Sequence, residues 1–73
     1  MKPSIEEMVA AVKKHALEHY EESGWDILVE AWTDEEIAEE LKHCRTIAGA
    51  IRKMGGIVGS HDRYRKEIEA EIT

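Results

Sequence analysis

The sequence contains little of what stabilises secreted domains or spans membranes. Its 73 residues include one cysteine, Cys44, one proline and no phenylalanine. A single cysteine permits no disulfide within the chain, which excludes the disulfide-rich class of secreted domains and fits a reducing cytoplasm. No apolar run approaches the ~20 residues of a membrane-spanning helix, and the N-terminus lacks a signal-peptide pattern. We therefore expect a cytoplasmic protein with one domain, residues 1–73, and no membrane-embedded part.

Charge is unevenly distributed along the chain. The net charge is −6. Residues 1–41 hold three basic and twelve acidic side chains, whereas residues 42–73 hold seven basic and four acidic ones. This asymmetry favours packing of the two halves against each other, or an acidic surface offered to a basic partner.

Both tryptophans lie in the segment 24–32, so much of the large apolar surface is concentrated there. Its apolar residues recur at helical spacing, i, i+3, i+4 and i+7: Trp25, Leu28, Val29 and Trp32. The pattern predicts a short buried helix with both tryptophans facing the interior. Gly24 is suited to ending the preceding helix, and Thr33 with Glu36 forms a capping box that starts the next one.

Two further helices flank the Trp segment. Ser4 and Glu7 form a capping box, and apolar residues at helical spacing predict a first helix from Ser4 to Ser23. The acidic segment predicts a short helix from Asp34 to about Lys42.

The last segment starts near Thr46 and carries a heptad-like seam. The seam consists of Ile47, Ile51, Met54, Val58, His61, Arg65, Ile68 and Ile72. Gly55, Gly56 and Gly59 disfavour a helix, but the apolar phase continues through them, so we favour one long helix. Two helices joined through Gly55 and Gly56 are the alternative. The predicted fold is all-α, a small helical bundle with three shorter helices packed on one long C-terminal helix.

The carboxylates of the segment 34–40 are the predicted partner-binding surface: Asp34, Glu35, Glu36, Glu39 and Glu40. Like-charged residues four apart destabilise an isolated helix slightly. A docking surface for a basic partner would explain the cluster, and an ordinary solvated face is the alternative.

The C-terminal helix also predicts a homodimer. Three short helices are too few to cover the seam from Val58 onward, and an uncovered apolar strip marks an interface. The predicted dimer interface is Met54, Val58, His61, Tyr64 and Ile68. Glycines on this helix would allow the two backbones to approach closely.

Two short patterns are typical of chemical sites. His15, Glu18 and His19 fit H-x-x-E-H, the motif of inverted zinc proteases. The chain is too short to add a further ligand and a substrate cleft. His43 and Cys44 are adjacent and point about 100° apart on a helix, so a packed structural cysteine is the better interpretation. We therefore expect no catalytic residue, no metal site and no cofactor.

The segment from Thr33 to Lys53 resembles the helix-turn-helix of bacterial transcription regulators, with an acidic first helix and an Ile37-Ala38 pair. The resemblance implies DNA contacts by Arg45, Arg52 and Lys53. The turn glycine is replaced by Lys42, and the neighbouring carboxylates oppose phosphate binding.

The stretch Gly24-Trp25-Asp26-Ile27-Leu28-Val29-Glu30-Ala31-Trp32-Thr33-Asp34-Glu35-Glu36-Ile37-Ala38 resembles short reading frames of bacteriophages and prophages. This resemblance implies a phage accessory protein that binds or inhibits a host or phage protein. Our leading hypothesis is a non-enzymatic, acidic protein-binding module, and the alternative is a DNA-binding transcriptional regulator.

Overall fold

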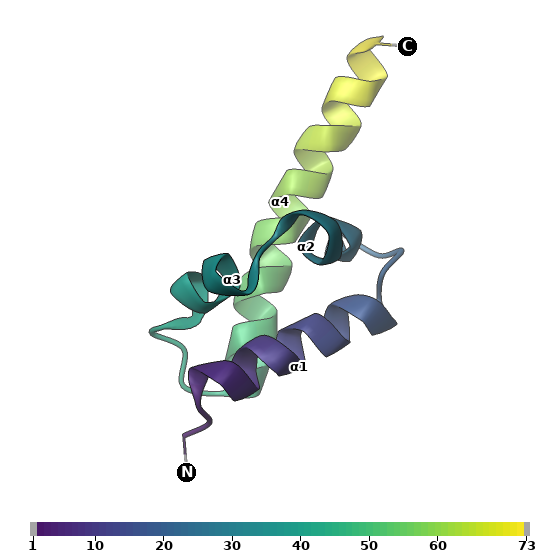
Figure 1. The fold of residues 1–73 in the computed structure, drawn as a ribbon. Coiled ribbons are helices and arrows are strands. Elements are labelled where there is room, and N and C mark those ends of the chain that lie inside the picture. The colour runs from purple at the N-terminus through teal and green to yellow at the C-terminus, as the bar shows by residue number, and fades with distance from the viewer. Residues whose placement is uncertain (1, 73) are drawn as a thin grey trace.

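A computed structural model describes residues 2–72, so the terminal residues of the predicted domain lie outside the described part. It contains α1 (Ile5–Glu18), α2 (Trp25–Ala31), α3 (Asp34–Leu41) and α4 (Ile47–Ile72). Within residues 2–72 there is no strand. The three shorter helices pack on α4 (Figure 1). The predicted all-α architecture is confirmed.

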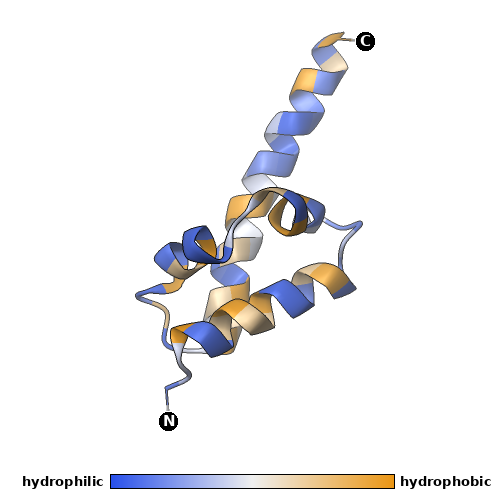
Figure 2. Ribbon diagram, viewed as in Figure 1, coloured by the Kyte–Doolittle hydropathy of each residue, from blue (hydrophilic) through white to orange (hydrophobic). Residues whose placement is uncertain are grey.

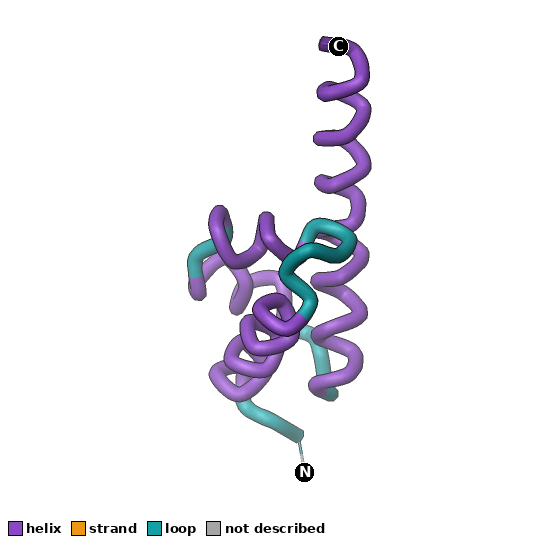
Figure 3. The backbone as a smooth tube through the Cα atoms, turned by 90° about the vertical axis from the view of Figure 1, so that its right-hand side faces the viewer, coloured by secondary structure: helices purple, strands orange, loops and turns teal. Residues whose placement is uncertain are grey.

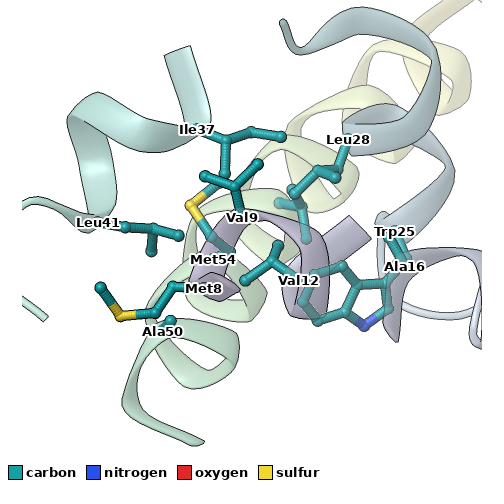
Figure 4. Close-up of a cluster of buried hydrophobic side chains, with 11 residues drawn as sticks. Met8, Val9, Val12, Ala16, Trp25, Leu28, Ile37, Leu41, Ala50 and Met54 are labelled. Carbon is teal, nitrogen blue, oxygen red and sulfur yellow. The ribbon is translucent and has the colours of Figure 1, made fainter. Parts of the chain in front are cut away.

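Side chains from all four helices meet in one core (Figure 4). From α1, Met8 and Val12 are fully buried. They fall four residues apart, on the face that the 3.6-residue period turns inward. The remaining core residues are Val9, Ala16, Trp25, Leu28, Ile37, Leu41, Ala50, Met54 and Val58. Burying each large apolar side chain contributes about 1.5–3 kcal/mol, so these positions determine how the helices cross.

The connection between α1 and α2 differs from the prediction. The first helix ends at Glu18 and not at Ser23. Ser23 and Gly24 both have positive φ, 46° and 87°, and two consecutive left-handed residues cannot continue a right-handed helix. A Cβ on Gly24 would lie 2.3 Å from the carbonyl oxygen of Val58. The right-handed helix therefore cannot continue through Ser23, and α1 ends earlier, at the C-cap His19, which has φ of −118° and ψ of 28°.

Local capping defines the starts of the other helices as predicted. The Ser4 hydroxyl accepts a hydrogen bond from the Glu7 amide at 3.0 Å. Thr33 and Glu36 form a complete capping box, and α3 ends at Leu41. The Thr46 hydroxyl accepts from the Gly49 amide at 2.9 Å, at the start of α4.

The last segment is one continuous helix, so the alternative of two helices joined through Gly55 and Gly56 is wrong. Gly55 lies against the bundle, where a Cβ would meet the Trp25 ring at 3.2 Å. At Gly56 and Gly59 a Cβ would meet nothing within 4 Å. Of these three glycines, only Gly55 lies where packing within the described residues leaves little room for a side chain.

The bundle covers more of α4 than the sequence suggested. Met54 and Val58 are 0% exposed, so they belong to the monomer core and not to a free dimer interface. The prediction that the short helices cannot cover Val58 is wrong, because the turn at Gly24 lies on that residue. The buried residues of α4 are spaced four apart, Ala50, Met54, Val58 and Asp62. Ile47 does not belong to this buried row and is 40% exposed.

The two tryptophans differ in burial. Trp25 is 6% exposed and confirms the prediction. Trp32 is only partly buried at the edge of the core, and Val29 is 37% exposed. The buried face of α2 is therefore narrower than the helical spacing of its apolar residues predicted.

The C-terminal turns of α4 extend beyond the other three helices (Figures 1 and 3). The molecule measures 49 × 21 × 19 Å along its principal axes. The projecting part is mostly hydrophilic (Figure 2). No described helix combines the length and the apolar character needed to cross a bilayer.

Candidate protein-interaction surfaces

The acidic surface of α3 is exposed and only partly neutralised. Asp34 pairs with Lys13 of α1 at 2.7 Å, and Glu39 pairs with Lys42 at 2.6 Å. The Lys42 ammonium lowers the pKa of Glu39 by a hydrogen bond and by its charge. The Glu36 carboxylate accepts from the Thr33 amide at 2.9 Å. Glu35, Glu36 and Glu40 form no ion pair within residues 2–72, so three of the five carboxylates here have no cation beside them.

A shallow hollow of about 380 Å³ lies beside this surface, and Trp32 forms part of its wall. The other lining residues are Glu35, Glu36, Glu39 and Glu40. Trp32 also stacks with His61 of α4, with ring centroids 6.1 Å apart. Trp32 is the C-cap of α2 and has an extended backbone, directly before Thr33 caps α3. The sequence prediction assigned Trp32 to the interior, because the helical spacing of the α2 segment does not show where that helix ends.

A second, larger groove runs between α1 and α3, with a volume of about 820 Å³. Its apolar lining includes Ile5, which is 38% exposed, and Leu17, which is 64% exposed. Lys13 and Asp34 also line it, and their ion pair joins the two helices. Nothing in the described residues fills this groove.

Charged residues cluster where α4 leaves the bundle. Arg65 donates to Asp26 of α2 at 2.9 Å and also to Asp62, and Lys66 lies 3.1 Å from Asp62. Asp62 is 6% exposed. The hydrogen bond from Arg65 lowers the pKa of Asp26, and those from Lys66 and Arg65 lower the pKa of Asp62. Both carboxylates raise the pKa of Arg65. This network joins α2 to α4. The sequence predicted Arg65 only as a member of the heptad-like seam of the last helix.

The predicted DNA-contacting residues are all exposed. Arg45 lies in the connection between α3 and α4, and Arg52 and Lys53 lie on α4. None of the three forms an ion pair in the described part of the chain. They remain accessible to a polyanion.

Residues of the two short patterns that are typical of chemical sites make packing contacts in the structure. The rings of His15 and His19 stack with centroids 4.2 Å apart, and those of His15 and Trp25 form a T-shaped pair with centroids 4.7 Å apart. His19 Nδ1 lies 3.0 Å from a Glu22 carboxylate oxygen. Residues 2–72 contain no group of three or more potential metal ligands. Cys44 is partly buried against the core, as predicted.

Comparison with protein-family models, with curated proteins and with solved structures found no match to this chain. Its function is therefore inferred from the surfaces described above.

Proposed function

We propose that this chain is a non-enzymatic module that binds a basic protein partner through the acidic surface of α3. The observation that supports this best is the hollow in which Trp32 lies among four glutamates. A cation over an indole ring is attracted by the π electrons, and nearby carboxylates add Coulomb attraction. An arginine side chain suits both features, since guanidinium stacks on aromatic rings and pairs with carboxylates.

The charges of α3 favour a partner over a purely solvated face. Glu35 with Glu39, and Glu36 with Glu40, are like-charged pairs four residues apart, which destabilise a helix by a few tenths of a kcal/mol each. Intramolecular cations neutralise Asp34 and Glu39 only. A basic segment bound here would relieve the repulsion that remains. The resemblance to phage and prophage reading frames suggests a host or phage protein as the partner, which binding would inhibit.

Titration with a nona-arginine peptide tests the proposal. The two indole N–H signals in a proton–nitrogen NMR spectrum serve as the readout, because buried Trp25 provides an internal reference for Trp32. We expect the Trp32 signal to shift at low salt and the Trp25 signal to stay in place. Trp32→Leu and the double variant Glu36→Gln/Glu40→Gln should each weaken binding about tenfold, the equivalent of roughly 1.4 kcal/mol. Glutamine retains the oxygen that the capping box needs.

The matched control is Glu18→Gln/Glu21→Gln, which removes the same charge from an exposed acidic stretch that has no tryptophan. It should weaken binding only slightly. Equal weakening by both double variants would mean that the peptide senses net charge alone, and the α3 surface would then be an ordinary solvated face.

DNA binding is the second candidate, and the exposure of Arg45, Arg52 and Lys53 supports it. The net charge of −6 opposes it. Affinity for random duplex DNA at low salt separates the two functions. Binding whose constant falls so that its logarithm is linear in the logarithm of salt concentration, and that Arg52→Gln/Lys53→Gln abolishes, would favour the DNA-binding alternative. We expect no such binding.

A further inference from the structure

His61 of α4 contacts the indole ring on which the proposed partner site depends. The rings of His61 and Trp32 are 24° from parallel, with centroids 6.1 Å apart, which is typical of an offset aromatic stack. The described residues that line the hollow are Trp32 and four glutamates, and His61 is not among them. The histidine therefore contacts Trp32 from outside the hollow and leaves the hollow open to a cation of the partner.

The side chain of His61 is exposed, as are Tyr64 and Ile68, which follow it on α4 and belong with it to the predicted dimer interface. An exposed imidazole can gain or lose a proton without disturbing the core. Histidine is the side chain that ordinarily changes its charge between about pH 5 and 8. The stack with Trp32 thus places an ionisable ring against the indole that would bind the partner.

The charged groups around this contact differ between α3 and the other helices. On α3, Glu36 and Glu40 line the hollow and have no cation beside them within residues 2–72. Several charged residues that α1, α2 and α4 bring nearby are held in ion pairs: Lys13 with Asp34, Arg65 with Asp26 and Asp62, and Lys66 with Asp62. A proton on His61 therefore adds a new positive charge beside an acidic surface, with the same sign as the cation of a partner.

We propose that protonation of His61 weakens cation binding at the α3 surface, so that the chain holds its basic partner near neutral pH and releases it in mild acid. This inference rests on the proposed function, because it concerns the same hollow. An imidazolium on Trp32 draws on the π electrons that would attract a guanidinium, and the two cations repel each other. By linkage, a bound guanidinium disfavours the proton on His61 to the same extent.

Titration with the nona-arginine peptide at two pH values tests this regulation, with the indole N–H signal of Trp32 as the readout at low salt. The peptide keeps its charge at both, because arginine does not lose its proton in proteins. Repulsion between two charges several ångströms apart at a protein surface predicts binding about fivefold weaker at about pH 5.5 than at about pH 7.5.

Two substitutions at this exposed position fix the charge of the ring or side chain that lies on Trp32. His61→Phe retains an aromatic ring that cannot be protonated, and it should bind the peptide at both pH values as tightly as the unmodified chain does at the higher one. His61→Arg carries a permanent cation that can stack on the indole. It should bind at both pH values about as weakly as the unmodified chain does at the lower one.

His43→Gln is the matched control, because His43 is the histidine whose charge lowers the pKa of Glu39 at the rim of the hollow. This variant should retain most of the pH dependence. The indole signal of Trp25 should keep its position in every variant, which shows that the core is intact.

The outcomes separate the two proposals. An unmodified chain that does not bind the peptide at the higher pH overturns the proposed function and this inference with it. Peptide binding of equal strength at both pH values overturns this inference alone. So does a pH dependence that persists in His61→Phe, because acid would then act through another group.

Discussion

The two halves of α4 are held in helical form by different forces. The half within the bundle, residues 47–62, contains four glycines but has Ala50, Met54 and Val58 fully buried. The free half, residues 63–72, is rich in arginine, lysine and glutamate and is almost entirely exposed. Glycine disfavours a helix by about 1 kcal/mol relative to alanine, whereas the residues of the free half are strong helix formers.

This difference shows that tertiary packing and local propensity can each substitute for the other within a single helix. In the bundle half, burial of apolar surface offsets weak propensity. In the free half, propensity contributes more, although Arg65 still forms an ion pair with Asp26 of α2. Substitutions in the two halves should therefore differ in both size and sign.

Removing the Trp25 side chain should have the largest effect. Trp25→Ala deletes the ring that packs between α1 and Gly55, and such a substitution costs about 3–5 kcal/mol. That is most of the net stability of a domain of this size, ~3–5 kcal/mol. Circular dichroism should show a largely unfolded chain at 25 °C. A cooperative melt close to that of the unmodified protein would contradict the packing described for α2.

Gly24→Ala should come next. The residue has φ of 87°, and an added Cβ would lie 2.3 Å from the Val58 carbonyl oxygen. Strain of this kind amounts to about 1–3 kcal/mol. Urea unfolding should show a lower midpoint with an unchanged slope. If the midpoint stays the same, α2 does not cross α4 at Val58.

Acidification should weaken the junction between the two halves. The pKa values of Asp26 and Asp62 lie below the ordinary value of 3.8 in the folded chain. Their contribution to stability is therefore complete above pH ~4 and is lost as the pH falls through the lowered folded pKa values. The unfolding midpoint should fall in that range, and less so in Asp62→Asn. An equal fall in both proteins would assign the acid sensitivity to other carboxylates.

Gly56→Ala and Gly59→Ala should stabilise the protein by about 0.5–1 kcal/mol each. The added methyl groups meet nothing within 4 Å, whereas the same change at Gly55 meets Trp25 at 3.2 Å. Thermal melts of the three variants compare the exposed and packed sides of one helix directly. Destabilisation by the exposed pair would mean that both glycines are engaged in a contact absent from the monomer.

Ile72→Ala should have the smallest effect, within about 0.5 kcal/mol, because the side chain is 79% exposed in the monomer. Urea unfolding followed by circular dichroism is the appropriate measurement. A loss approaching that of Met54→Ala would show that the end of α4 folds back onto the bundle.

Features that depend on neighbouring residues could be predicted from the sequence. The caps at Ser4 and Thr33 and the short acidic helix involve residues within a few positions of one another. The close approach of Gly24 to Val58 could not be predicted, because these residues are far apart in the chain. Burial of Asp62 likewise depends on a network that includes Asp26.

The candidate protein-interaction surface of α3 could likewise be predicted only in the part that depends on neighbouring residues. The five carboxylates of α3 could be listed from the sequence, since charge runs are visible there. The place of Trp32 beside them could not, because an amphipathic pattern cannot distinguish a fully buried tryptophan from one at the edge of the core. His61 contacts this ring from α4, and no local pattern connects the two residues.

The packing of α1 against α4 also constrains how the chain folds as it is synthesised. Met8 and Val12 are synthesised well before Met54 and Val58, which complete the core that buries them. The apolar face of α1 therefore stays solvated, or is held by another protein, until α4 has left the ribosome. The capped start of α1 and its polar outer face keep the nascent helix soluble during that delay.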